Sequence, residues 1–318
     1  MKLQRFALAL AGVGMLAATA AAGPATAAVR SNPTPAIANP AEGNLKTTPT
    51  TKLATSGGCV QDVGFNTPTP GINDVLITPG KPPRGQWYGE FRFVGTRLNT
   101  TWYGVQTDAH LYYHGLFVQN GTLYRGVTYF DTEYPRPTYA RIGSGWTSFT
   151  QLVTSNYAIT APNRSYLYGL STNGSLYRYA ASGATFRALG HFPGFQGFKA
   201  MTVISETPTY DTLLMTTKAG ALWTVRIPAA ASTKPILKLV RSTGFAAYES
   251  LAARECGDKG GTLVTGFDND TDSAYQYAMS KFNGSTTAVT SYGRVPGGTI
   301  PGTGIFSVTG HWNQLVGE

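Results

Sequence analysis

Charged residues are scarce in this chain, at only 13% of its 318 residues, and cysteine is scarcer still, with 2 in the whole sequence. The Lys and Arg residues are scattered, which argues against a specific nucleic-acid site, because such sites need clustered positive charge. Beyond the N-terminal segment, no apolar run is long enough to span a bilayer. The sequence also lacks HExxH, G-x-S-x-G, Walker and dinucleotide-binding motifs.

The N-terminus has the features of a secretory signal peptide. Lys2 and Arg5 precede an apolar run over 6–22, and small residues follow at 25–28. This order predicts a signal peptide over 1–28 and therefore a secreted, extracellular protein. Residues 29–58 are rich in Pro, Thr and Ala without apolar periodicity, which predicts a disordered linker. The folded domain is then expected over 59–318.

Export leaves two cysteines, Cys59 and Cys256. Neither lies in a CxxC motif or beside a histidine, so a metal-binding or catalytic role is disfavoured. In an oxidising compartment the pair is expected to form one disulfide. That bond would join the start of the folded domain to its last third.

Two phrases repeat along the domain. The first is Gly-aromatic-x-x-aromatic-x-x-aliphatic, which begins at Gly145, Gly194 and Gly244, that is, after steps of 49 (194 − 145) and 50 (244 − 194) residues. The second is Asn-Gly-x-Leu-Tyr-Arg, at 120–125 and 173–178, with weaker copies at 219–223 and 272–277. Strand-like runs flank each second phrase, which predicts β-hairpins, with a type I′ turn at Asn173-Gly174.

A repeat of this length with a hairpin and two flanking strands is typical of a β-propeller blade. The sequence therefore predicts an all-β, five-bladed β-propeller. Four complete blades are expected at about 95–144, 145–193, 194–243 and 244–293. The remaining segments, 59–94 and 294–318, are expected to complete one blade together, with Gly310–Val316 as its first strand. Such a blade would leave no unpaired sheet edge at the closure of the ring.

One stretch resembles a known family. Leu123-Tyr124-Arg125-Gly126, then Ala140-Arg141-Ile142-Gly143 with Gly145-Trp146, then Asn173-Gly174 with Leu176-Tyr177, is similar to the repeat of the tachylectin-2-like lectins. The resemblance is good over about 120–179 and weaker elsewhere. It implies a five-bladed propeller that binds N-acetylated sugars between neighbouring blades. The family's Asp-Asn-Trp loop is not kept here.

The loop that takes its place supplies the candidate ligand-binding residues. It combines aromatic rings, carboxylates and a guanidinium, the groups that a shallow carbohydrate site uses. These candidates are Asp131, Glu133, Tyr134, Arg136 and Tyr139. By contrast, Trp146, Phe195 and Phe245 occur at matched points of three repeats, which favours packing between blades.

Asp268, Asp270 and Asp272 alternate like the start of a calcium loop, but the Gly and the downstream Glu of such a loop are missing. They stay weak candidates for a metal site, so no cofactor other than a weak possibility of calcium is expected.

The leading hypothesis is a secreted lectin that binds glycans or cell-wall polysaccharide through shallow sites between blades, and no catalytic residue is assigned. The alternative is a propeller enzyme acting on polysaccharide, a glycoside hydrolase or lyase, with carboxylates at the channel. Its candidate carboxylates are Glu90, Asp108, Glu206 and Glu249. Sugar specificity and oligomeric state are left open by the sequence.

Overall fold

The computed structural model describes residues 59–66, 72–87, 96–107, 111–129, 138–158, 163–230, 233–256, 261–297, 300, 303–310, 315 and 317. The signal peptide and linker expected over 1–28 and 29–58 lie outside these residues and stay predictions. All regular elements within the described ranges are β-strands, so the all-β prediction is confirmed. That part of the chain holds no helix with the length and apolarity needed to cross a bilayer.

Three of the sheets are four-stranded and antiparallel, with the strands in order along the chain. Each therefore follows the simplest meander, in which consecutive strands pair through short connections. The first contains β9 (Phe149–Tyr157), β10 (Arg164–Ser171), β11 (Leu176–Ser182) and β12 (Thr185–Phe192). The second contains β13 (Phe198–Glu206), β14 (Tyr210–Thr217), β15 (Leu222–Pro228) and β16 (Ile236–Arg241). The third contains β17 (Ser250–Glu255), β18 (Thr262–Asp268), β19 (Ser273–Ser280) and β20 (Ala288–Arg294).

The fourth sheet has nine strands and consists of two halves. One half contains β1 (Gln61–Asn66), β2 (Ile72–Ile77), β3 (Arg84–Trp87) and the C-terminal strand β21 (Thr303–Gly310). The other half contains β4 (Thr96–Asn99), β5 (Trp102–Gln106), β6 (Leu111–Gln119), β7 (Thr122–Tyr129) and β8 (Thr138–Ser144). A short parallel pairing of β21 with β5, over 308–310 and 102–104, joins the halves.

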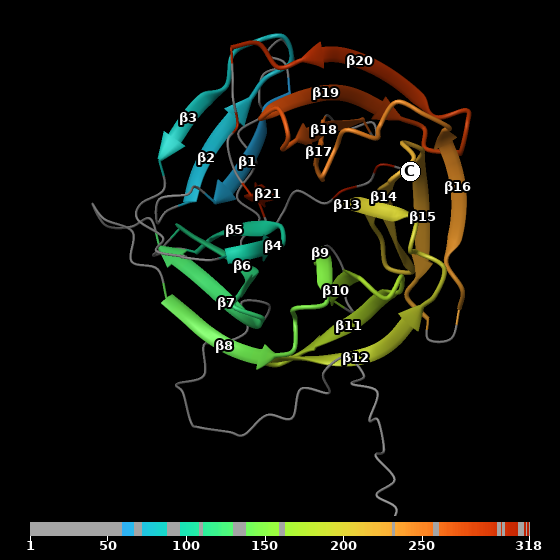
Figure 1. Ribbon diagram of the computed structural model, residues 1–318. Helices are drawn as coiled ribbons and strands as arrows, with labels where there is room; N and C mark the ends of the chain where they lie inside the picture. Colours follow the sequence, from blue (N-terminus) through green and yellow to red (C-terminus); the bar gives the residue numbers. More distant parts are fainter. Residues whose placement is uncertain are drawn as a thin grey trace, which may run out of the picture.

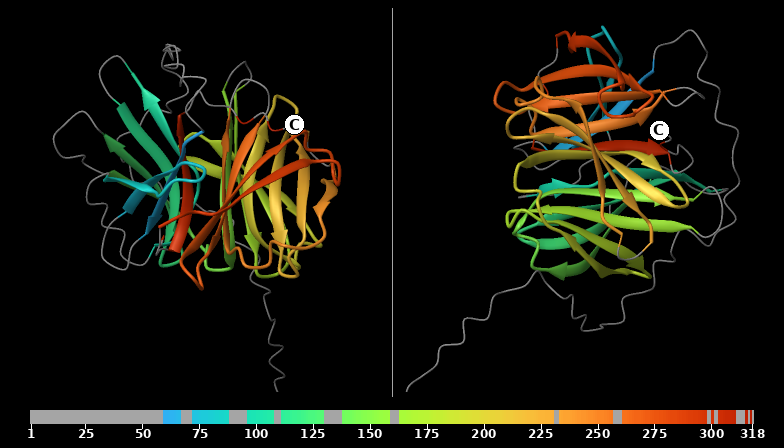
Figure 2. Two further views of the ribbon diagram at one scale, coloured as in Figure 1. Left: turned by 90° about the horizontal axis from the view of Figure 1, so that it is seen from above. Right: turned by 90° about the vertical axis from the view of Figure 1, so that its right-hand side faces the viewer.

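The sheets stand around a common axis, with their first strands near the centre and their last strands at the rim (Figure 1). Neighbouring central strands contact one another in the order β5, β21, β17, β13 and β9, and β9 also contacts β4. Seen from the side, the strands run through the thickness of the ring (Figure 2). The faces of adjacent sheets therefore meet along radial seams, and side chains from both faces fill them.

The two ends of the folded domain pair directly. In the register of β1 with β21, Asp62 lies opposite Val308 and Gly64 opposite Phe306. The strand that pairs with β1 is β21, at 303–310, and not the expected Gly310–Val316, most of which lies outside the described residues. Ile305 and Phe306 on β21 point to opposite faces and enter two different core clusters, so this segment can be buried on both sides.

The expected disulfide is present between Cys59 and Cys256, with the two Cα atoms 5.6 Å apart across a sequence separation of 197 residues. It fastens Cys59, two positions before β1, to Cys256, the residue directly after β17. Closing so long a loop restricts the unfolded chain strongly, which stabilises the fold.

The repeated phrases explain how one sheet follows the next. Trp146, Phe195 and Phe245 are buried, with 5%, 3% and 5% exposure, as expected for packing between sheets. Their backbone N–H groups donate to the carbonyl oxygens of Gly121, Gly174 and Gly220 in the preceding sheet, at 3.0, 2.8 and 3.0 Å. The same residue type at each junction therefore serves both packing and backbone hydrogen bonding.

The turn prediction at Asn173-Gly174 is wrong. Gly174 has a positive φ of 78°, but Asn173 does not adopt a positive φ, whereas a type I′ turn needs both. The Gly174 N–H donates to the Ser171 carbonyl at 3.0 Å, and the Ser171 N–H donates to the Ser175 carbonyl at 3.0 Å. This is a three-residue loop, in which Thr172 adds one residue and glycine takes the left-handed position. The type I′ geometry occurs instead at Asn120 and Gly121, with φ of 49° and 71°.

Candidate functional site

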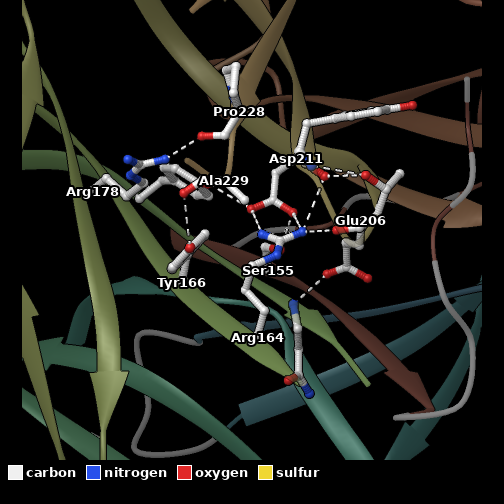
Figure 3. Close-up of polar contacts among 12 residues, drawn as sticks. Ser155, Arg164, Tyr166, Arg178, Glu206, Asp211, Pro228 and Ala229 are labelled. Carbon is white, nitrogen blue, oxygen red and sulfur yellow. Dashed lines mark hydrogen bonds and ion pairs between the residues drawn. The ribbon is translucent and has the colours of Figure 1, made fainter. Parts of the chain in front are cut away.

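The densest polar cluster lies where the β9–β12 sheet meets the β13–β16 sheet, which we call the β9–β13 seam (Figure 3). Ser155, Arg164 and Tyr168 come from the β9–β12 sheet, and Glu206 and Asp211 come from the hairpin between β13 and β14. Apart from Tyr168, which lies in the middle of β10, these residues stand near the ends of strands, where the hairpin of one sheet reaches the neighbouring sheet. The cluster therefore spans two repeats.

Asp211 is the centre of this cluster. Its side chain is fully buried, and its two carboxylate oxygens accept hydrogen bonds from Arg164 at 2.6 and 2.8 Å. Ser155 Oγ and Tyr168 OH each donate to it as well, at 2.6 Å. Four donors satisfy the acceptor capacity of this carboxylate, so its charge is compensated where water cannot reach it.

Glu206 lies beside Asp211 in the register of the hairpin. Its Oε1 accepts from the Asn156 N–H at 2.8 Å and from Tyr103 OH at 3.3 Å. Burial, with a smaller contribution from Asp211, raises the pKa of Glu206 to about 8. The same burial, with Glu206 nearby, raises the pKa of Tyr103 well above its usual range.

Arg178 holds the outer part of the same seam. Its Nη1 donates to the Pro228 carbonyl at 2.6 Å, and its Nη2 to the Ala230 carbonyl at 3.5 Å. Its guanidinium also lies over the ring of Tyr166, 5.4 Å from the centroid. The cation is thus stabilised by backbone dipoles and an aromatic face from both sheets.

These contacts bear on the predicted channel carboxylates. Glu206 is 2% exposed and hydrogen-bonded, and Asp211 is saturated, so neither can reach a substrate in this conformation. Glu249 pairs with Lys199 Nζ at 2.9 Å and accepts from the Asn269 N–H at 2.9 Å, which fixes a turn. Glu90 and Asp108 lie outside the described residues. The arrangement is that of a structural cluster that joins two sheets.

The seam between the β5–β8 half-sheet and the β9–β12 sheet, which we call the β5–β9 seam, is built differently. Leu116, Leu123, Leu152 and Leu167 fill its buried part. Arg125, on β7, lies on the same strand face as Leu123 and therefore points into this seam. Burial lowers the pKa of Arg125 from its usual value.

Of the five predicted ligand-binding residues, only Tyr139 lies in the described part of the chain. It is on β8, 44% exposed, and its ring packs edge-on against Phe117 with centroids 5.9 Å apart. A large part of the Tyr139 side chain is therefore exposed to solvent. Asp131, Glu133, Tyr134 and Arg136 lie outside the described residues, and their role stays a prediction.

A second pair of buried acids occurs at the joined ends of the chain. Asp74, on β2, is 1% exposed, and Asp62, on β1, is 9% exposed. Burial raises the pKa of both carboxyls, and for Asp74 the neighbouring Asp62 raises it further. Arg254, whose own pKa is lowered by burial, attracts Asp62. The sequence pattern gave no sign of this pair, because its members belong to different strands.

The weak calcium candidates take part in a turn. Asp268 Oδ1 accepts from the backbone N–H groups of Asp270 and Thr271, at 3.1 and 3.2 Å. Among the described residues no three His, Cys, Asp or Glu side chains gather as a metal-binding group. A role for Asp268, Asp270 and Asp272 in metal binding stays an untested prediction.

The chain is similar to known proteins in its fold but not in its sequence. No family model matches the sequence, and no curated protein matches it. Solved structures do match: Aleuria aurantia lectin, described as a fungal lectin with a six-bladed β-propeller fold and a novel fucose recognition mode, is 17% identical. The match covers 81% of this chain and 82% of that chain, with a TM-score of 0.51.

A variant of the same lectin, in complex with Fucα1-6GlcNAc, is 16% identical over 78% of this chain and 80% of that chain, with a TM-score of 0.50. A GH62 hydrolase in complex with xylotriose is matched less well, with a TM-score of 0.41 at 11% identity. At these identities the first two likenesses show the fold, a β-propeller, and leave the chemistry to be argued from the residues.

Proposed function

We propose that this chain is a secreted carbohydrate-binding protein, a β-propeller of five blades with shallow glycan sites between blades. Three blades correspond to the four-stranded sheets, and the two halves of the nine-stranded sheet supply the others. The half made of β21 and β1–β3 would be the blade completed by both ends of the chain. The compared Aleuria lectin has six blades, so five is a proposal specific to this sequence.

The spacing of the junction residues supports five repeats. After Trp146, Phe195 and Phe245, the next residue at this spacing is Val295, which is 3% exposed. Its N–H donates to the Ala274 carbonyl in the preceding sheet at 2.8 Å, like the aromatic residues before it. Val295 would therefore begin the fifth repeat, which continues through β21 into the strands after Cys59.

The carbohydrate assignment rests chiefly on one observation, which is the exposed ring of Tyr139 held at the edge of the candidate loop. An aromatic face beside hydroxyl-binding groups suits a pyranose ring, and several weak sites on a rigid ring gain from avidity. The Aleuria aurantia lectin structures, one described by a fucose recognition mode and one in complex with Fucα1-6GlcNAc, support the class of ligand. Membership of the tachylectin-2-like lectins, carried by the motif over 120–179, is part of the same proposal.

Secretion is proposed from the N-terminal segment, and the disulfide between Cys59 and Cys256 is compatible with an oxidising compartment. The enzyme alternative has less support. It needs carboxylates that reach a substrate, while Glu206 and Asp211 are buried and hydrogen-bonded. Glycans and cell-wall polysaccharide are therefore the proposed partners.

The test uses the mature protein on a glycan array that includes peptidoglycan, chitin oligomers and fucosylated sugars. Tyr139→Ala should reduce binding to the recognised sugar about tenfold, because stacking on an aromatic ring is lost. Tyr292→Ala is the matched control, since Tyr292 is a similarly exposed tyrosine, at 48%, on the outer strand of another sheet.

Failure of the native protein to bind any sugar or polysaccharide would remove the proposed function. Release of reducing ends from a polysaccharide would replace it with the enzyme alternative. Equal losses for Tyr139→Ala and Tyr292→Ala would keep the lectin but move the site away from the candidate loop.

A further inference from the structure

Arg125 and Arg178 occupy the same place in successive repeats. Both end the phrase Leu-Tyr-Arg on the third strand of their sheet, and in the registers Arg125 lies opposite Leu116 as Arg178 lies opposite Tyr168. Each therefore points toward the sheet that follows along the chain. The two arginines can be compared directly.

The next sheet supplies partners for Arg178 but not for Arg125. In the β9–β13 seam, the end of β15 and the segment that follows it present the carbonyls of Pro228 and Ala230 to Arg178. The matching connection for Arg125 is the turn between β11 and β12, where Ser182 already pairs with Thr185. This two-residue turn has no counterpart of the longer segment that carries the Ala230 carbonyl.

Within the described part of the chain, Arg125 has no hydrogen-bond, ion-pair or cation–π partner, although it is only partly exposed. Its neighbours on the same strand face are Leu123 and Val127, at 0% and 5% exposure. A guanidinium in such surroundings keeps its charge and has donors to spare, because arginine does not deprotonate in proteins. Retaining it there costs stability unless something compensates the charge.

The acids of the β9–β13 seam are also missing from the β5–β9 seam. The hairpin pair Glu206 and Asp211 corresponds to the hairpin pair Asn156 and Ser165 in the β9–β12 sheet. Two neutral residues therefore take the places of two carboxylates. Among the described residues, the β5–β9 seam has a cation without the anions that its neighbour uses. The net charge, +9 for the full sequence and +7 (9 − 2) without Lys2 and Arg5 of the expected signal peptide, adds a general attraction for anions.

We propose that Arg125 is the anchor of an anion-binding subsite in the β5–β9 seam, which takes an acidic substituent of a glycan, a carboxylate, sulfate or phosphate group. This inference rests on the proposed carbohydrate function and narrows it to acidic polysaccharides. The planar guanidinium can donate two parallel hydrogen bonds to any of these oxyanions. A lysine could supply the charge but not the paired geometry.

Binding is measured with the mature protein against polygalacturonate, heparin and polyphosphate, which carry carboxylate, sulfate and phosphate groups, and against neutral amylose and chitin oligomers. The variants are Arg125→Gln and Arg125→Lys, with Arg187→Gln as control. Arg187 is exposed on β12, so its loss changes the net charge equally without touching the seam. Circular dichroism and thermal unfolding check that each variant folds.

We expect the native protein to bind at least one acidic polymer. Arg125→Gln should weaken that binding about tenfold or more and Arg125→Lys should weaken it less, while Arg187→Gln should stay within about twofold. Without polymer, Arg125→Gln should unfold at the native temperature or above it, because an uncompensated cation is removed. Saturating polymer should raise the unfolding temperature of the native protein but not that of Arg125→Gln.

The polymer that binds identifies the oxyanion. Equal binding of an acidic polymer by Arg125→Gln and Arg187→Gln would overturn the subsite, and so would binding of neutral glycans alone, which would leave the lectin proposal standing. Failure to bind any glycan, acidic or neutral, would overturn both. A clear loss of stability in Arg125→Gln without polymer would show that the arginine has a structural partner, which also contradicts the inference.

Discussion

The two seams on either side of the β9–β12 sheet present the same motif to different surroundings. In the β9–β13 seam, Arg164 and Arg178 are held by Asp211 and by backbone carbonyls of the next sheet. In the β5–β9 seam, Arg125 faces leucines and has neither kind of partner among the residues that the structure describes. An arginine at the same position of two repeats can therefore join one pair of sheets and remain available to a ligand between another pair.

This difference comes from the next repeat and not from the arginine. The longer connection after β15 and the acidic β13–β14 hairpin neutralise the β9–β13 seam. The tight β11–β12 turn and the neutral Asn156 and Ser165 leave the β5–β9 seam positive. Ligand specificity in a repeat protein can thus depend on loop length and on two substitutions at hairpin ends.

The largest effect is expected when the β9–β13 seam loses its central carboxylate. Asp211→Asn should lower the free energy of unfolding by about 3–5 kcal/mol, because Arg164 is left buried and uncompensated. Urea unfolding at neutral pH measures it, with Asp270→Asn on the exposed β18–β19 turn as control. A loss below about 1 kcal/mol would show that this seam is not held by the ion pair.

A smaller loss is expected for Tyr168→Phe, which removes one donor to Asp211. Hydrogen bonds to charged groups contribute about 1.5–3 kcal/mol, so urea unfolding should show a loss in that range. Tyr166→Phe, which removes only a 3.4 Å bond to the Ala229 carbonyl, should cost less. Equal losses of unfolding free energy for Tyr168→Phe and Tyr166→Phe would contradict the central role of Asp211 in this seam.

The pH dependence should also distinguish the seams. The pKa of Glu206 is raised to about 8 in the folded protein from 4.5, so the folded state binds its proton more tightly than the unfolded state. This contribution to stability is present below pH 4.5 and is lost as the pH rises toward 8, at up to about 1.4 kcal/mol per pH unit.

Glu206→Gln keeps the acceptor for Tyr103 and Asn156 but does not titrate. Unfolding measured from pH 4.5 to 8.5 should therefore show the native protein losing stability relative to this variant. Asn156, the matching residue of the β5–β9 seam, does not titrate and therefore adds no such pH dependence to the stability. Parallel curves for the two proteins would mean that Glu206 titrates normally.

The smallest change in stability is expected when the β5–β9 seam is given an acid. Ser165→Asp places a carboxylate at the position that matches Asp211, which should alter the free energy of unfolding by less than about 1 kcal/mol. It should nevertheless weaken binding of acidic polymers several-fold, because the seam is no longer positive. Thr172→Asp, at an exposed turn of the same sheet, is the charge-matched control for both measurements.

Much of the fold could be predicted because the repeats carry it. The period between Trp146, Phe195 and Phe245 and the hairpins around Gly121 and Gly174 follow from local sequence. The position of β21 could not be predicted, since Ile305 and Phe306 make a strand only when both neighbouring half-sheets cover them. The type I′ prediction at Asn173-Gly174 failed because the loop contains one more residue, Thr172, and an Asn-Gly dipeptide alone does not reveal the loop length.

The candidate site was predicted less well, for a physical reason. Asp211 and Arg164 become partners across two sheets, and no spacing in the sequence announces such a pair. Tyr139 was singled out because an aromatic residue in a polar loop is a local signal, and its role in ligand binding stays a prediction. Arg125 was visible as part of a repeated phrase, but its lack of partners appears only when both seams are compared.

Amide hydrogen exchange with and without an acidic polysaccharide tests the difference between the seams most directly. We expect slower exchange in β7 and in the β9–β10 hairpin when the polysaccharide is bound, with little change in the β13–β14 hairpin. Equal protection of both hairpins, or protection confined to the β13–β14 hairpin, would contradict it.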